Sequence, residues 1–198
     1  MKPKVRTFIA IELPDKVRSD IRQLKHLFTP YRFDIRWVKP LNMHLTIQFL
    51  GDVDLVDLEA IGRVLSDKAG HFPSFDLIPR GLGIFPSLKR PRIIWIGIAG
   101  QTDVLGSIQK SVSSGLNDLG FTAQKRPFRG HLTFGRIKSR IDQKRLLDAL
   151  HAQQKFVSKA FSVDHLVMFK SELTQGGPIY TKLYEAPLGI STTHNPNV

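Results

Sequence analysis

The sequence MHLTIQFLG, at residues 43–51, indicates a fold with two similar halves, because residues 130–136 repeat its centre as GHLTFGR. Both copies contain the tripeptide His-Leu-Thr, at His44–Thr46 and at His131–Thr133, and 87 residues (131 − 44) separate them. Each copy alternates polar and apolar side chains, which is typical of a strand with one buried face. Each strand is therefore expected to present its histidine and its threonine on the same face.

Two imidazoles that flank one phosphate can perform acid–base catalysis near neutral pH, because the ordinary pKa of histidine is about 6.5. In an in-line displacement at phosphorus, a neutral imidazole accepts a proton from the attacking oxygen and an imidazolium donates one to the leaving oxygen. Thr46 and Thr133 would each place a hydroxyl donor beside the non-bridging oxygens. Arg136 would add a fixed positive charge for the transition state. This scheme needs no metal and no other cofactor.

A structural pair and a metal site are the alternatives to a catalytic pair of histidines. A single strand histidine beside a threonine is usually a structural pair, but two identical copies favour a shared site. A zinc site at His44 and His131 is disfavoured, because neither an HExxH motif nor a set of nearby carboxylates accompanies them. The sequence therefore predicts a catalytic pair of histidines and no metal ligands.

Three aromatic residues near the motifs are expected to pack in the core. Phe49 lies three positions beyond Thr46, which is the opposite face of an ideal strand. A twist or a bulge would instead bring Phe49 to the edge of a cleft, where it could stack on a base. Trp37 and Trp95 are expected to line the core, and Trp95 lies within the strongly apolar segment RIIWIGIA.

Charge and composition narrow the class of protein. The 198 residues include 29 Lys and Arg against 17 Asp and Glu, which gives a net charge of +12. This positive charge favours binding of nucleic acid or of phosphorylated ligands. The alternative is that the basic residues only make the surface more soluble. The absence of cysteine excludes disulfides, thiolate zinc sites and a cysteine nucleophile. No stretch resembles a signal segment or a membrane span. We expect a cytoplasmic monomer with no membrane contact and no obligate protein partner.

The periodicity of apolar residues predicts an α+β fold. Strands are expected at residues 5–13, 35–38, 43–50, 75–85, 92–99 and 128–136, with a closing hairpin of 161–171 and 179–186. Helices are expected at residues 15–28, 55–69, 102–119 and 142–153. A turn at Gly51–Asp52 should end the first motif strand, and the glycines of 75–85 should introduce a bulge. We expect a single bilobal domain over residues 1–188 and a disordered tail over 189–198. Its two antiparallel β-sheet lobes, with helices outside, should face a central cleft with pseudo-twofold symmetry.

The sequence resembles the 2H phosphoesterase superfamily, and within it the bacterial and archaeal RNA 2′,3′-cyclic phosphodiesterases once named 2′-5′ RNA ligases. The segments HLTI and HLTF, at 44–47 and 131–134, match the two His-x-Thr-x motifs of that superfamily. The resemblance extends almost from end to end of the chain. It includes RTFIAIELP at 6–14, WVKPLNMHLTIQFLGDV at 37–53, GIFPSLKRPRIIWIGI at 83–98 and SELTQGGPIYTKL at 171–183.

The resemblance implies hydrolysis of a 2′,3′-cyclic phosphate, on an RNA 3′ end or a cyclic nucleotide, to a 2′-phosphomonoester. It implies that His44 is the proton donor to the departing 3′ oxygen and that His131 is the proton acceptor from water. Thr46, Thr133 and Arg136 match phosphate-binding positions. A reverse 2′-5′ ligation is a secondary implication.

Two positions depart from the usual pattern of the family. Gly130 stands where a proline commonly precedes the second histidine, and Leu41 stands where a glutamate is frequent. Two classes of alternative function stay open at this point. The chain could be a non-catalytic module that binds RNA ends. It could also be an enzyme acting on small cyclic phosphates, on 2′-5′ linked oligonucleotides or in tRNA-splicing ligation.

Overall fold

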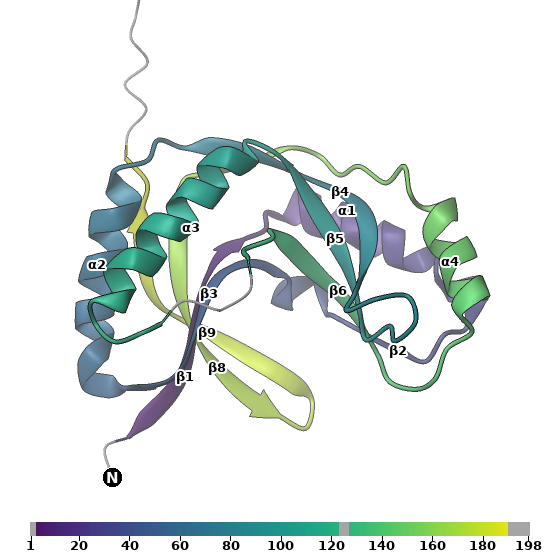
Figure 1. Cartoon of the computed structure of the whole chain (residues 1–198), viewed down its shortest axis with the longest axis horizontal. Helices are drawn as coiled ribbons and strands as arrows, with labels where there is room; N and C mark the ends of the chain where they lie inside the picture. The colour runs from purple at the N-terminus through teal and green to yellow at the C-terminus, as the bar shows by residue number, and fades with distance from the viewer. Residues whose placement is uncertain (1–2, 123–126, 190–198) are drawn as a thin grey trace, which may run out of the picture.

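The computed structural model describes residues 3–122 and 127–189, and it contains one antiparallel sheet with helices packed against it (Figure 1). The strands are β1 (Lys4–Glu12), β2 (Ile35–Trp37), β3 (His44–Asp54), β4 (Phe75–Phe85), β5 (Ile93–Gly100), β6 (His131–Ile137), β7 (Phe161–Val163), β8 (His165–Thr174) and β9 (Gly177–Pro187). The helices are α1 (Asp15–His26), α2 (Leu58–Gly70), α3 (Thr102–Asn117) and α4 (Gln143–Ala152), and short 3-10 turns occupy Thr29–Tyr31, Pro40–Asn42 and Leu55–Asp57. None of the helices in this described part combines the length and apolar character needed to cross a bilayer.

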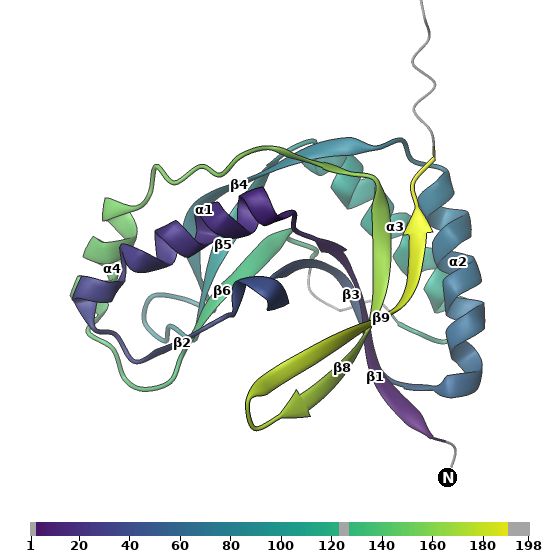
Figure 2. The same cartoon turned by 180° about the vertical axis from the view of Figure 1, so that it is seen from behind.

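The sheet has two halves, and they confirm the predicted α+β fold with two antiparallel lobes. The strand order is β7-β4-β5-β6-β3-β1-β8-β9, with β2 also paired to β6. We call β3, β1, β8 and β9 with α2 and α3 the first lobe, and the remaining strands with α1 and α4 the second lobe. The lobes share one curled sheet, because Leu45 on β3 is paired with Leu132 on β6 where they meet. Figures 1 and 2 show α2 with α3 at one end of the molecule and α1 with α4 at the other.

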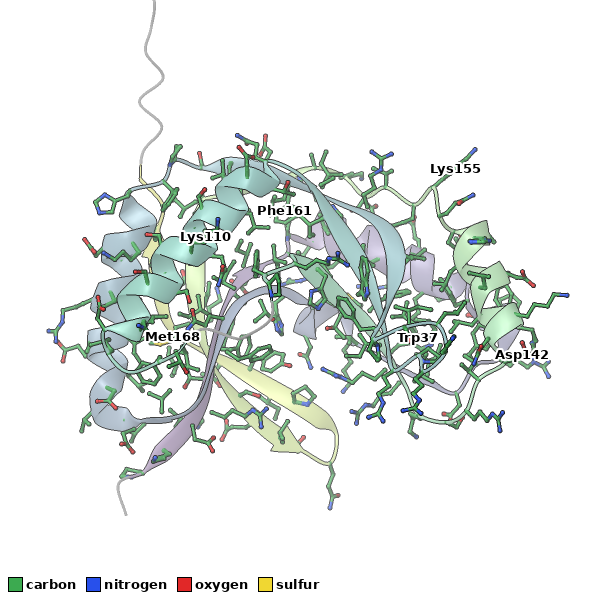
Figure 3. The ribbon with its side chains drawn as sticks, in the orientation of Figure 1. Trp37, Lys110, Asp142, Lys155, Phe161 and Met168 are labelled. Atoms are coloured by element: carbon green, nitrogen blue, oxygen red, sulfur yellow. The ribbon has the colours of Figure 1, made fainter. Side chains whose placement is uncertain are left out.

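Burial of apolar side chains on the helix-covered face holds both lobes together. The main cluster of buried residues includes Val17, Ile21 and Leu24 of α1, whose spacing of three and four residues forms one face of a helix. Met168 on β8 and Trp37 on β2 belong to or pack against this cluster, and Figure 3 places them towards opposite ends of the molecule. A continuous apolar core therefore extends through both lobes and fixes the sheet that carries the two motifs.

Two sequence predictions about strand ends are wrong because tertiary pairing extends or shortens the strands. Gly51–Asp52 does not end the first motif strand: Gly51 has a φ of 75° and β3 continues to Asp54, paired with Lys4 on β1. The second motif strand begins at His131 rather than at residue 128. The bulge predicted in 75–85 is confirmed, since β4 changes register at Gly81, which has a φ of 67°.

The closing hairpin is formed by β8 and β9, but its first strand begins at His165 rather than at residue 161 and continues to Thr174, beyond the predicted end at residue 171. Phe161–Val163 forms the separate strand β7, which pairs with β4 of the second lobe instead of continuing into β8. Gly189, predicted to begin a disordered tail, is held in place: its N–H donates to the carbonyl of Phe72 at 2.8 Å. The rest of the predicted tail, residues 190–198, lies outside the described residues.

Candidate active site

The pairing of β3 with β6 brings the two His-Leu-Thr motifs together. Leu45 and Leu132 are Cα partners and both side chains are completely buried. Because the strands are antiparallel, the histidine of each motif lies across from the threonine of the other. Since alternate side chains in a strand point to opposite faces, the four polar residues share the face opposite the two leucines. This arrangement is the common face that the duplicated sequence predicts.

A cavity of about 450 Å³ opens on this face. Its lining includes His44, Thr46 and Thr133, together with Phe49 and Arg136, so it brings together five of the six predicted site residues. The sixth, His131, is not among the lining residues, although it lies two positions before Thr133 on the same face of β6. The volume lies within the range of about 300–1,000 Å³ that is usual for small-molecule sites.

Both imidazoles are oriented in the same way by their own strands. Nδ1 of His44 lies 3.0 Å from the carbonyl oxygen of Asn42, and Nδ1 of His131 lies 2.8 Å from the carbonyl oxygen of Arg129. A carbonyl can only accept, so each Nδ1 carries the proton and donates it. Nε2 is then the nitrogen that can accept or donate a proton towards a ligand. The repeat therefore preserves the tautomer of the histidine as well as the residue itself.

The first lobe surrounds His44 with aromatic rings. Its ring centroid lies 4.6 Å from that of Phe8, 5.2 Å from that of Tyr180 and 6.5 Å from that of Phe169. Phe8 and Phe169 belong to a small buried cluster that is separate from the main core. Burial lowers the pKa of His44 to about 4, and the bond to the Asn42 carbonyl opposes this only in part. His44 is therefore neutral at pH 7 in the ligand-free protein.

The second lobe supports His131 with Phe85 and Trp95, whose ring centroids lie 5.0 Å and 6.4 Å from that of the imidazole. The prediction that Trp95 lines the core is wrong. Its neighbours Ile94 and Ile96 are buried on the core face, so Trp95 points to the cleft face of β5. Gly83 on β4 makes room for the indole, because a Cβ at that position would lie 2.0 Å from the ring.

Two bulges correct the side-chain parity expected from the sequence. The register of β3 against β1 slips at Ile47, and the register of β6 against β5 slips at Phe134, again 87 residues later (134 − 47). Each bulge adds one residue and so returns the following positions to the cleft face. As a result Phe49 is 51% exposed and lines the cavity, and the core packing expected for it is wrong. Arg136, at the equivalent position of the second motif, lines the same cavity.

The cavity is strongly cationic. Among residues 3–122 and 127–189, the charged residues that line it are Arg6, Arg36, Lys39 and Arg136, and no aspartate or glutamate of these ranges does so. Burial raises the pKa of the Tyr180 hydroxyl, and Arg136 and Arg6 partly offset this shift. In the described part of the chain, no three His, Asp or Glu side chains gather in a group that could hold a metal ion. The cleft therefore offers hydrogen-bond donors and positive charge to an anion.

Several site residues escaped the sequence analysis because they lie far from the motifs. Phe8 and Tyr180 are examples, and the only local signal for Phe8 was the unbroken apolar run Phe8–Ile11, which is typical of a strand covered on both faces. Asn42 has a further role beyond its carbonyl, since its side-chain Nδ2 donates to the carbonyl of Pro178 at 2.8 Å. This bond ties the segment before His44 to the tip of the β8–β9 hairpin.

Comparison with known proteins matches both halves of the chain to one family model, described as LigT like Phosphoesterase, at residues 11–95 and again at 96–180. Each match contains one His-Leu-Thr motif. The chain belongs to the LigT-like phosphoesterases. The family model matches this LigT-like phosphoesterase twice, which agrees with the internal duplication expected from the repeated tripeptide.

Relatives and solved structures match most of the length of this LigT-like phosphoesterase. It is 33% identical over 182 residues to the Thermotoga maritima protein named RNA 2′,3′-cyclic phosphodiesterase, covering 91% of this chain and 94% of the relative. The Aquifex aeolicus protein of the same name is 35% identical and covers 78% of this chain and 82% of the relative. A crystal structure of E. coli LigT complexed with 3′-AMP has a TM-score of 0.74 at 25% identity, covering 94% of this chain and 99% of that chain.

Proposed function

We propose that this LigT-like phosphoesterase hydrolyses the 2′,3′-cyclic phosphate of RNA 3′ ends to a 2′-phosphomonoester by two-histidine acid–base catalysis. The observation that carries the proposal is the pairing of the motifs. A backbone carbonyl occupies Nδ1 of each histidine, so that each Nε2 is the nitrogen that can serve a ligand, and both threonines lie on the same face as the histidines. The names of the relatives and the cationic cavity support it. The reverse reaction, 2′-5′ ligation, would use the same groups.

Each residue receives a role in this scheme. His44 donates a proton to the departing 3′ oxygen, and His131 accepts one from the attacking water. Thr46 and Thr133 donate hydrogen bonds to the non-bridging oxygens, and Arg136 supplies positive charge as the phosphorane develops. The aromatic face of Phe49 lies beside these groups in the cavity and can stack on a base.

The donor role of His44 requires that ligand binding change its protonation. Burial holds the pKa of His44 at about 4 in the ligand-free protein, whereas a proton donor must carry its proton in the complex. A phosphate anion in the same cavity favours the imidazolium and raises this pKa. An NMR titration of the His44 ring, with and without a non-hydrolysable analogue of the 2′,3′-cyclic phosphate, tests this step. If His44 stays neutral in the complex while His131 carries the proton, the two histidines exchange roles.

The proposal is tested by incubating the protein with an RNA that ends in a 2′,3′-cyclic phosphate, in the presence of EDTA, and identifying the product. We expect a 2′-phosphate end, a bell-shaped dependence of rate on pH, and losses of about 10²–10⁴ in turnover for His44→Ala and for His131→Ala. A protein that binds the RNA in a salt-sensitive way without forming product would be an RNA-end-binding module instead. Full turnover in either histidine variant contradicts the mechanism.

A further inference from the structure

Two arginines lie directly across from each other beside the predicted reaction centre. Arg36 on β2 and Arg136 on β6 are Cα partners, both side chains are exposed, and both line the cavity that contains His44 and Thr133. Cβ atoms of directly opposed residues in an antiparallel pair lie about 4.5–5.5 Å apart. The two arginine side chains therefore leave the sheet side by side, at one position of the cleft.

Like charges at directly opposed positions destabilise a sheet unless something of opposite charge lies between them. No carboxylate within residues 3–122 or 127–189 forms an ion pair with Arg36 or Arg136. Arg6 and Lys39 add further positive charge to the same cavity. A bound anion would supply this counter-charge, and a guanidinium group suits the geometry of a phosphate.

This position extends beyond the reacting phosphate. Arg136 follows Thr133 by three residues, but the bulge at Phe134 takes up one of them. A strand advances about 3.3 Å per residue, so the arginine pair lies about 7 Å further along β6. The long side chain of Arg136 can reach back towards the reaction centre, but Arg36 comes from the neighbouring strand. A cyclic mononucleotide carries one phosphate, and its binding would leave Arg36 without a partner.

We propose that Arg36, beside the Arg136 that serves the reacting phosphate, forms a second phosphate subsite that holds the phosphate on the 5′ oxygen of the terminal nucleotide. This inference rests on the proposed function and specifies its substrate class: a cyclic-phosphate end that also carries a 5′-side phosphate. Such a phosphate is either the internal phosphodiester of an RNA chain or the 5′-monophosphate of a single nucleotide. Both present the same anionic oxygens to Arg36.

Three substrates separate the effect of a 5′-side phosphate from the effect of a second nucleoside. They are a nucleoside 2′,3′-cyclic phosphate, the same molecule with a 5′-phosphate, and a dinucleotide ending in a cyclic phosphate. The intact protein should have a kcat/KM about tenfold higher for the second and third substrates than for the first. Arg36→Gln should remove most of this preference, and Arg36→Lys should restore only part of it, because lysine lacks the planar fork. The slope of log Ki against log salt for a 2′-phosphate-ended dinucleotide should become shallower by about 0.7 in Arg36→Gln.

Arg63→Gln is the matched control. Arg63 lies on α2, is paired with Glu59 at 2.8 Å and does not line the cavity, so removing its charge should leave the substrate preference unchanged. Equal losses on all three substrates in Arg36→Gln, or no preference in the intact protein, would overturn the subsite while leaving the proposed function standing. A preference for the dinucleotide without one for the 5′-phosphorylated mononucleotide would also overturn it, because the second nucleoside would then be what is recognised. Failure of the intact protein to hydrolyse any of the three would refute the proposed function itself.

Discussion

Acid should weaken this fold through His44, and a single substitution should remove that sensitivity. The pKa of His44 is about 4 in the folded protein, against 6.5 for an ordinary histidine. Between these two values the unfolded chain binds more protons than the folded one, so the free energy of unfolding falls as the pH falls. From pH 7 to pH 4.5 the loss from this one group is about 2 kcal/mol. Above pH 6.5 its contribution to stability is fully present.

Urea unfolding followed by circular dichroism at pH 7 and pH 4.5 measures this loss. The substitution His44→Gln removes the titrating group, and its amide can still donate a hydrogen bond to the Asn42 carbonyl. The variant should lose about 2 kcal/mol less than the intact protein over this interval, because every other group is common to both. His151→Gln, at an exposed position of α4, is the control for loss of an imidazole and should lose as much as the intact protein.

The result that would refute the reasoning is an equal loss of stability in His44→Gln and in the intact protein. His44 would then be as well hydrated in the folded state as in the unfolded chain. The contacts with the aromatic rings of Phe8, Phe169 and Tyr180 would not be desolvating its ring.

Two further predictions concern the threonine hydroxyls of the two motifs and the packing of the second lobe around Trp95. Thr46→Val and Thr133→Val should each reduce kcat/KM by about 10- to 100-fold, because each substitution removes one hydrogen bond to a charged oxygen of the substrate. The urea midpoint of unfolding should stay unchanged. An unchanged kcat/KM in both variants would argue against phosphate contacts. Gly83→Ala should destabilise the protein by about 1–3 kcal/mol, because the new methyl group collides with the Trp95 ring. Gly106→Ala on α3 is the control, because no atom of another element lies within 4 Å of the new methyl group among the described residues. This substitution should be neutral or should stabilise the protein by up to about 1 kcal/mol in the same urea titration. Equal effects at the two glycines would contradict the packing argument.

The sequence by itself determined the elements whose signals are local. The alternation in the two motif copies predicted two strands that present His44 and His131 with their threonines, because side-chain direction in a strand depends only on neighbouring positions. Apolar spacing likewise predicted the helices to within a few residues. The repeat at an interval of 87 residues indicated two similar halves before any pairing was known.

Only the tertiary structure decided which strands meet and where their registers slip. The bulge at Ile47 is defined by the pairing of β3 with β1, so no property of the segment itself could show that Phe49 returns to the cleft. The opposition of Arg36 to Arg136 likewise depends on which strand pairs with β6. The depressed pKa of His44 has the same origin, since the rings that bury it come from β1, β8 and β9. The burial of a side chain, the register of a strand and the charges around a residue depend on residues that are distant in the chain. Strand and helix patterns depend only on residues that are close in the sequence.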